Sequence, residues 1–290
     1  MDFAHELSQK TDIVNRYLME FAPKRDEACD KLYEAIHYSL SAGGKRIRPI
    51  LALSVCQMLG GAEEEVMPFA CALEYVHTYS LIDEVMPCTD NDDLRRGLHT
   101  CHIKYSEAFA LLAGDALLNH AFEVIANAHA EYDVIVKALG IISKASGIRG
   151  MAGGQAIDLE GANTAQQLVC LYNMKTGALI TAAAQIGVLT SGQSDCNILD
   201  AATRFAENLG IAFQIKDDLL DVEGEESHIG KRIGHDAETG KKTYVHFFGV
   251  DGARAHLREY TDEAISALGI FGDKAQFLRA FSDYLLKRDS

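Results

Sequence analysis

Proline is almost absent from this chain, and its distribution limits the folds that the chain can adopt. The 290 residues include four prolines, at positions 23, 49, 68 and 87, so the stretch from residue 88 to the end has none. That stretch is rich in Ala, Leu and Glu, which favour helix. Apolar residues recur there at steps of three and four, as in Phe109, Leu112, Ala113, Ala116 and Leu117. We therefore predict an all-α, single-domain helical bundle over residues 1–290.

Glycine pairs and polar stretches divide this helical sequence. We expect connecting loops at Ala42–Gly44, Gly60–Gly61, Gly153–Gly154, Ser191–Gln193 and residues 224–240. No internal repeat or linker splits the chain.

Charge and cysteine content restrict the possible partners and compartment. With 42 acidic against 27 basic residues the net charge is −15, which repels nucleic acid and anionic membranes. An anionic ligand would need a local basic site and divalent metal. The seven cysteines include no CxxC pair, and no basic region followed by an apolar one opens the chain. We expect a cytoplasmic protein with no nucleic-acid or membrane partner.

Two charged segments, one basic and one of mixed charge, could bind an anion. In the segment GGKRIRP, Gly43 and Gly44 allow close backbone approach while Lys45 and Arg48 supply the donors that a diphosphate needs. Such a cluster by itself is more often solvated surface. The second segment, residues 77–102, places carboxylates close to two arginines, a combination that suits a metal-bridged anion. Its helical spacing puts His77 on the same face as an acidic residue two turns later.

A third segment, FQIKDDLLD, carries the sharpest signal. Asp217 and Asp221 are four residues apart and share one helix face. Two carboxylates about 4 Å apart repel by about 4 kcal/mol at an effective dielectric constant of about 20, so a cation should offset them. Oxygen ligands suit Mg²⁺, which commonly bridges carboxylates to phosphates. An acidic helix end that faces water is the alternative.

These segments, in this order and together with GGQAIDLE and KTGALI, resemble the trans-prenyltransferase (polyprenyl synthetase) family. The resemblance runs from about Tyr38 to Tyr244 and is strongest to the bacterial farnesyl diphosphate synthase branch. It implies a fold of the isoprenoid synthase type around a deep central cavity, two facing acidic motifs that hold three Mg²⁺ ions, and a homodimer.

The resemblance also implies a head-to-tail condensation. Isopentenyl diphosphate joins an allylic diphosphate, dimethylallyl or geranyl, to give farnesyl diphosphate. Metal ions neutralise the leaving diphosphate, an allylic cation forms, the double bond of isopentenyl diphosphate attacks it, and a proton passes to the released diphosphate.

Roles for individual residues follow from the same resemblance. The residues implied to hold isopentenyl diphosphate are Gly44, Lys45, Arg48, His77 and Arg96. Those implied to contact the allylic diphosphate are Arg95, Lys175, Gln214 and Lys231. Thr176 and Gln214 would steady the cation, and the implied catalytic set is Lys175, Thr176, Gln214 and Asp217. The implied metal ligands are Glu84, Asp90, Asp217, Asp218 and Asp221.

The first acidic motif departs from the family pattern HDDLPxMD. This chain reads DEVMPCTD, so Asp83 replaces the histidine, Glu84 the first aspartate and Val85 the second, while Asp90 is retained. The longer Glu arm displaces a bound metal, and a misplacement of about 1 Å can cost about 10²-fold in rate. We therefore predict a weak or altered enzyme. Two alternatives are a terpene synthase-like lyase on the same fold and a non-catalytic partner subunit of another prenyltransferase.

Product length is the last inference from the resemblance. In the family, bulky groups four and five residues before the first Asp limit chain growth, and these positions are Ser80 and Tyr79 here. The aromatic Tyr79 is typical of C15 producers. Helical spacing alone instead puts Ser80 one turn below Glu84.

Overall fold

The computed structural model describes residues 2–223 and 241–286 and is helical almost throughout these ranges. Its α-helices are α1 (Phe3–Phe21), α2 (Asp30–Ser41), α3 (Ile47–Met58), α4 (Glu63–Glu84), α5 (Cys101–Lys104), α6 (Glu107–Ala126), α7 (Tyr132–Ser146), α8 (Met151–Glu160), α9 (Ala165–Tyr172), α10 (Ala178–Thr190), α11 (Cys196–Glu223), α14 (Tyr244–Ala267) and α15 (Gln276–Leu286). Short turns η1 (Glu27–Cys29), η2 (Asn173–Gly177) and η3 (Leu268–Ala275) connect some of them. The all-α prediction is confirmed.

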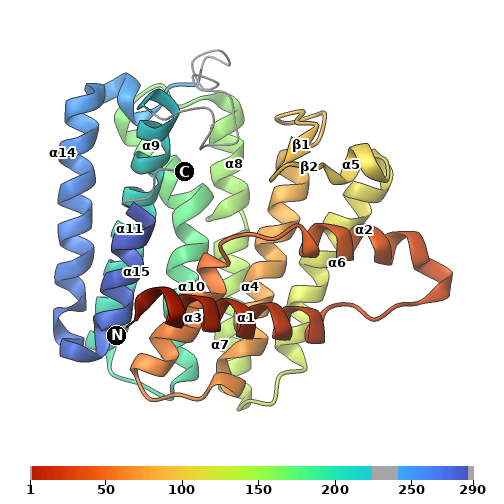
Figure 1. The fold of residues 1–290 in the computed structure, drawn as a ribbon, viewed down its shortest axis with the longest axis horizontal. Coiled ribbons are helices and arrows are strands. Elements are labelled where there is room, and N and C mark those ends of the chain that lie inside the picture. The colour runs from red at the N-terminus through yellow and green to blue at the C-terminus, as the bar shows by residue number, and fades with distance from the viewer. Residues whose placement is uncertain (1, 224–240, 287–290) are drawn as a thin grey trace.

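Strand structure in the described residues is limited to one hairpin. Strands β1 (Leu94–Arg95) and β2 (Leu98–His99) pair antiparallel, with Leu94 opposite His99. The hairpin follows α4 and therefore carries the arginine pair of the second segment above the end of that helix (Figure 1).

Polar side chains define where several helices begin. Asp2, Ser106, Thr164 and Thr243 each accept a hydrogen bond from a first-turn backbone N–H group. These caps satisfy donors that have no partner inside the helix. Short polar residues just before apolar periodic segments thus set the register of α1, α6, α9 and α14.

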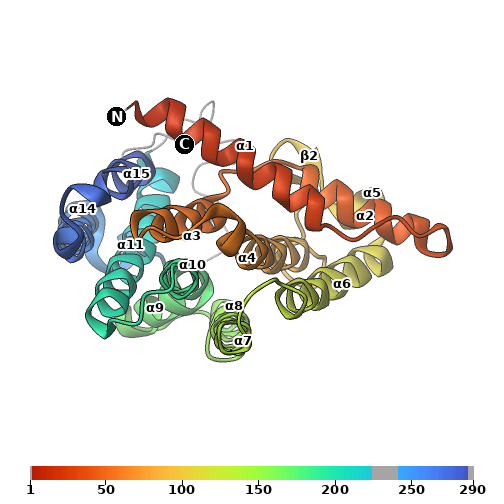
Figure 2. The same ribbon diagram turned by 90° about the horizontal axis from the view of Figure 1, so that it is seen from below.

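Helices α3, α4 and α10 form the centre of the bundle. Almost all of α3 is buried, and α10 crosses it so closely that a methyl group on Gly187 would lie 2.6 Å from the carbonyl oxygen of Ala52. Helices α11, α14 and α15 cover one side, and α2 and α6 cover the other (Figures 1 and 2). The C-terminal ends of α4 and α11, which carry the two acidic motifs, lie at the same end of the bundle (Figure 1).

Helix α6 is long and apolar enough to cross a membrane by length and composition. It nevertheless contains Asp115 and packs against α2, α4, α5 and α7. Ala113, Leu117 and Ala121 are fully buried on the side that faces these helices. Helix α6 is therefore a core helix of the bundle.

Candidate active site

The last turn of α4 directs its two adjacent acidic side chains to different neighbours. Glu84 Oε1 lies 3.0 Å from Lys175 Nζ, and Glu84 Oε2 lies 2.9 Å from Arg95 Nη1. Asp83 instead lies against α6, where a methyl group on Gly114 would come within 2.8 Å of Asp83 Oδ1. Val85 is 2% exposed. Of the changed positions of the first motif, Glu84 is thus the one that contacts the cations of the candidate site.

Asp83 occupies an environment that disfavours its charge. Burial raises the pKa of Asp83 to about 6, the charge of Asp115 on α6 adds to this, and hydrogen bonding with Tyr79 opposes it. Its carboxyl group therefore takes up a proton at a pH well above that of an ordinary aspartate.

Lys175 connects the first acidic motif to α8. Its Nζ atom lies 2.7 Å from Asp158 Oδ2 as well as 3.0 Å from Glu84 Oε1. Burial alone would lower the pKa of Lys175, but the carboxylates of Glu84 and Asp158 outweigh burial and hold that pKa above its ordinary value. The ammonium group is thus fixed as a cation at the centre of the site.

The position of Lys175 depends on two glycines of α8. A methyl group on Gly154 would lie 2.3 Å from the backbone nitrogen of Lys175, and one on Gly153 would lie 2.7 Å from Met174 Cε. Both glycines are inside α8, so the predicted loop at Gly153–Gly154 is wrong. Glycine costs a helix only about 1 kcal/mol, and here it lets η2 approach the backbone of α8.

The π-helical turn η2 lies between the two acidic motifs. Lys175 contacts the first motif, and the next residue, Thr176, donates from Oγ1 to Gln214 Oε1 at 2.9 Å. Gln214 precedes Asp217 by about one turn of α11. Single π-helical turns inside helices are frequent at functional sites. The turn places a cation and a hydroxyl side by side between α4 and α11.

The second acidic motif divides between half-buried and buried carboxylates. Asp217 and Asp221 are partly accessible, one turn apart on α11. Asp218 is 6% exposed, and its Oδ2 accepts hydrogen bonds from the Tyr172 hydroxyl and, at 2.6 Å, from the Tyr244 N–H group. Asp218 thereby connects α11 to the end of α9 and the start of α14.

Lys241 also contacts the first acidic motif, which its position in the sequence does not predict. Its Nζ lies 3.6 Å from Asp90 Oδ1 and 3.6 Å from Asp158 Oδ2. Lys241 follows both contacted residues by a long stretch of sequence and lies just before the Thr243 cap of α14. It nevertheless contacts both the first motif and α8. The sequence feature that could have indicated this residue is the Lys241-Lys242 pair before the cap, but spacing alone cannot place the pair next to Asp90.

A basic cluster of Arg48, Arg96 and His77 lies at α4. Arg96 Nη1 donates to the carbonyl oxygen of Gly43, and a methyl group on Gly44, whose φ is +130°, would lie 2.6 Å from Arg96 Nη2. Burial lowers the pKa of Arg48 to about 10, so its guanidinium remains charged at neutral pH. Burial lowers the pKa of His77 well below 6.5, and Arg48 and Arg96 act in the same direction, so its imidazole is neutral. Lys45, in the loop that precedes α3, is exposed.

Arg46, in the middle of the same basic segment, points the other way. It has a positive φ of 46° and is 6% exposed, and it donates to Asn15 Oδ1, Glu74 Oε1 and the carbonyl oxygen of Leu40. This buried ion pair between Arg46 and Glu74 anchors the loop that carries Lys45 and leads to Arg48.

The remaining predicted residues are Tyr79, Ser80 and Lys231. Ser80 Oγ donates to the carbonyl oxygen of His77 at 2.8 Å, within α4. Tyr79 is half-buried, next to Asp83 and Gly114. Lys231 lies outside the described residues.

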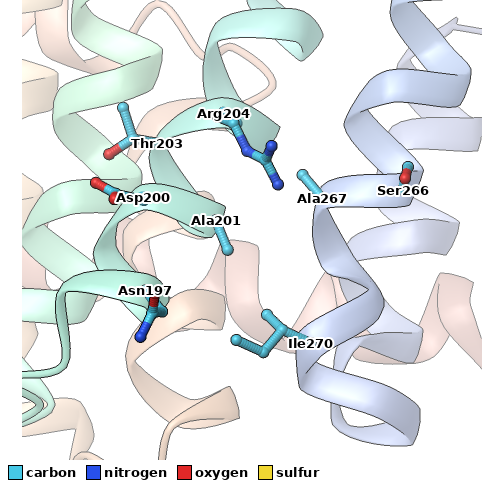
Figure 3. Close-up of a pocket in the computed structure, with 8 residues that line it drawn as sticks. All are labelled: Asn197, Asp200, Ala201, Thr203, Arg204, Ser266, Ala267 and Ile270. Atoms are coloured by element: carbon cyan, nitrogen blue, oxygen red, sulfur yellow. The ribbon is translucent and has the colours of Figure 1, made fainter.

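A separate cavity of about 530 Å³ lies between α11 and the turn from α14 into η3 (Figure 3). Asp200, Arg204 and Ile270 are among its lining residues, and none of the predicted site residues lines it. It does not belong to the candidate active site.

The donor set of the site fits Mg²⁺ that is shared with a substrate. The candidate ligands Glu84, Asp90, Asp217 and Asp221 offer only oxygen, which Mg²⁺ prefers. Lys175, Arg95 and Lys241 already place positive charge between the first motif and α8. Among residues 2–223 and 241–286, however, no three acidic, histidine or cysteine side chains converge into a metal cage. Such carboxylates suit a metal whose remaining ligands are water and substrate phosphate.

An all-helical bundle with carboxylates on two helix ends, and cations both between and beside them, defines a class of enzyme that handles diphosphates. The family model for polyprenyl synthetase matches residues 29–272, and the chain belongs to this family.

Relatives and solved structures cover the chain along its whole length. It is 39% identical to the farnesyl diphosphate synthase of Micrococcus luteus, with 98% of each protein covered, and 38% identical to that of Escherichia coli, with 100% of each covered. It is also 42% identical to the geranylgeranyl diphosphate synthase of Cyanophora paradoxa, covering 98% of this chain and 96% of that protein. The Helicobacter pylori geranyltransferase, solved with magnesium and isoprenyl diphosphate, superposes with a TM-score of 0.86 at 31% identity, over 99% of this chain and 97% of that one.

Proposed function

We propose that this protein condenses isopentenyl diphosphate head-to-tail with dimethylallyl or geranyl diphosphate to give farnesyl diphosphate. The observation that carries the proposal is the link through η2, in which Lys175 contacts Glu84 and the adjacent Thr176 contacts Gln214. This link puts one cation and one pair of oxygen dipoles between the two acidic helix ends. The family's synthases among its relatives support condensation over the lyase and the partner-subunit alternatives.

The allylic diphosphate binds between the acidic motifs. Arg95 and Lys175 contact its oxygens, and Lys231 is a further contact by resemblance. Lys241 joins them, because its ammonium group already lies between Asp90 and Asp158. These cations hold the leaving group as it gains charge, where fixed positive charge is most effective.

Isopentenyl diphosphate binds at the basic cluster beside α4. Lys45, Arg48 and Arg96 neutralise its diphosphate, and Gly44 lets the backbone approach it. His77 is neutral and therefore contributes a hydrogen bond without a further charge. The five-carbon chain then points toward η2.

The carbocation forms beside η2. Thr176 and Gln214 share a hydrogen bond, which fixes the direction of their oxygen dipoles. Those oxygens stabilise the developing positive charge, and apolar walls keep water away from it. The released diphosphate accepts the proton that the new product loses.

Three Mg²⁺ ions belong to this site in our proposal. Glu84 and Asp90 would hold metal on one side, and Asp217 and Asp221 would hold it on the other. When bound, the ions neutralise the leaving diphosphate. Asp218, which the resemblance implies as a further ligand, has a supporting role in our proposal. Its Oδ2 already accepts two hydrogen bonds, so Asp218 holds α11 in place.

We assign a homodimer in the cytoplasm. Helix α6 packs one face on the bundle and leaves Leu111 and Leu112 about half exposed on the other, at 53% and 50%. Two adjacent leucines on an apolar helix favour burial against a second copy.

One assay tests the function. Purified protein with Mg²⁺, isopentenyl diphosphate and geranyl diphosphate should release diphosphate and yield a C15 product on chromatography. Product formed from geranyl diphosphate alone would favour the lyase. No diphosphate release in either mixture, with turnover restored by Asp83→His plus Val85→Asp, would mean that the natural chain is inactive. A dominant product of C20 or longer would contradict the farnesyl assignment.

A further inference from the structure

Asp83 and Tyr79 meet on the side of α4 that faces α6. They are one helical turn apart, and the Tyr79 hydroxyl is within hydrogen-bonding reach of the Asp83 carboxylate. Both side chains also lie against Gly114 of the facing helix α6. A methyl group on Gly114 would be 2.8 Å from Asp83 Oδ1 and 3.4 Å from Tyr79 Cδ2.

The close approach of α6 leaves these side chains little room. Asp83 and Tyr79 are both half-buried, and Gly114 of α6 is buried. An ionised carboxylate only accepts hydrogen bonds, whereas the phenol can donate one. The pair is therefore complementary, and it fixes the far end of an aromatic ring that would otherwise turn about two side-chain bonds.

We propose that Asp83 is a positioning residue that holds the Tyr79 ring against α6 and thereby limits the length of the prenyl product. This inference rests on the proposed function, the formation of a C15 product, and on the chain-length role that the family resemblance gives to Tyr79. Tyr79 lies one turn farther from the acidic end than Asp83, so a growing chain reaches the ring after it has passed Glu84. A ring held against α6 keeps one wall of that path in a single position, and a released ring lets the chain extend past it.

The test measures the ratio of C20 to C15 product at saturating geranyl and isopentenyl diphosphates. Asp83→Ala and Tyr79→Phe should each raise this ratio about tenfold, the size of effect that corresponds to one lost hydrogen bond to a charged group. The double variant should show no larger ratio than either single variant, because both remove the same contact. Asp83→Asn keeps an acceptor oxygen and should leave the ratio within about twofold of wild type.

Two further variants distinguish an error in the role of Tyr79 from an error in the inference about Asp83. Tyr132→Phe removes a hydroxyl from a side chain that is 87% exposed and serves as the matched control, with an unchanged ratio expected. Tyr79→Ala removes the ring itself, so an unchanged ratio in this variant contradicts the proposed role of Tyr79 and the inference with it. A raised ratio in Tyr79→Ala with no change in Asp83→Ala and Tyr79→Phe overturns the inference alone. Should Asp83→Ala fail to fold, the ratio in Tyr79→Phe decides the question. A merely structural role of Asp83 would lower turnover at an unchanged ratio, which also overturns the inference.

Discussion

Lys175 Nζ lies 3.0 Å from Glu84 Oε1, so a residue on a π-helical turn meets the altered first position of the first acidic motif. The longer glutamate arm spans to Lys175 and Arg95 at once. Diphosphate binding must loosen these contacts, because the same cations are the proposed ligands of its oxygens. The substitution at residue 84 therefore affects both the metal ligand and its counterions.

Shortening this arm should increase activity. In Glu84→Asp the carboxylate retreats toward α4 and matches the proposed metal position better, so kcat should rise by about 10-fold to 100-fold. The concentration of Mg²⁺ that gives half-maximal rate should fall in the same variant. Glu84→Gln keeps the length without the charge and should lose most turnover. A slower Glu84→Asp enzyme would contradict this interpretation.

Crowding η2 should displace Lys175. Gly154→Ala places a methyl group 2.3 Å from the Lys175 backbone nitrogen, which forces the two elements apart. We expect a loss of about 1–3 kcal/mol in the free energy of unfolding together with a reduced kcat. Gly140→Ala is the matched control, since a methyl group there meets nothing within 4 Å in helix α7. It should gain up to about 1 kcal/mol and keep its activity. Denaturant unfolding and steady-state rates measure both effects.

The adjacent carboxylates of the second motif should separate by function. Asp217→Asn should raise the Mg²⁺ concentration needed for half-maximal rate, because it removes a proposed metal ligand. Asp218→Asn should leave that concentration nearly unchanged but reduce thermal stability. The carboxylate that accepts hydrogen bonds from Tyr172 and Tyr244 is replaced by an uncharged amide, which is a weaker acceptor. Equal shifts of the Mg²⁺ dependence in both variants would instead make Asp218 a direct ligand.

The raised pKa of Asp83, about 6, predicts a pH-dependent contribution to stability. Its ordinary value is 3.8, so between these values the folded state binds more protons than the unfolded state, and stability falls as the pH rises. Asp83→Asn has no such proton. The stability of this variant relative to wild type should therefore increase from pH 4 to about pH 6.5 and stay constant above it. A difference that is flat across this range would contradict the burial of the charge.

The sequence alone predicted the helical class, which the structure confirms, and it supplied the candidate residues of the site. Proline depletion and apolar spacing at three and four residues are local properties of the chain, and they are sufficient for an all-α bundle. The same applies to Asp217 and Asp221, whose spacing puts them on one face of α11. Local pattern failed at Gly153–Gly154, where two glycines indicated a loop but serve close packing of α8 against η2.

The tertiary structure decided which charged groups meet. Sequence spacing could not show that Asp83 faces α6 while Glu84 faces Lys175. Adjacent side chains of α4 point in different directions, and only the packing of the helices determines which residues they contact. Sequence spacing also could not predict the contacts of Lys241 with Asp90 and of Tyr244 with Asp218, since these contacts join segments far apart in the chain. Composition and periodicity thus determined the helical class, whereas the partners of each buried charge depended on which helices pack together.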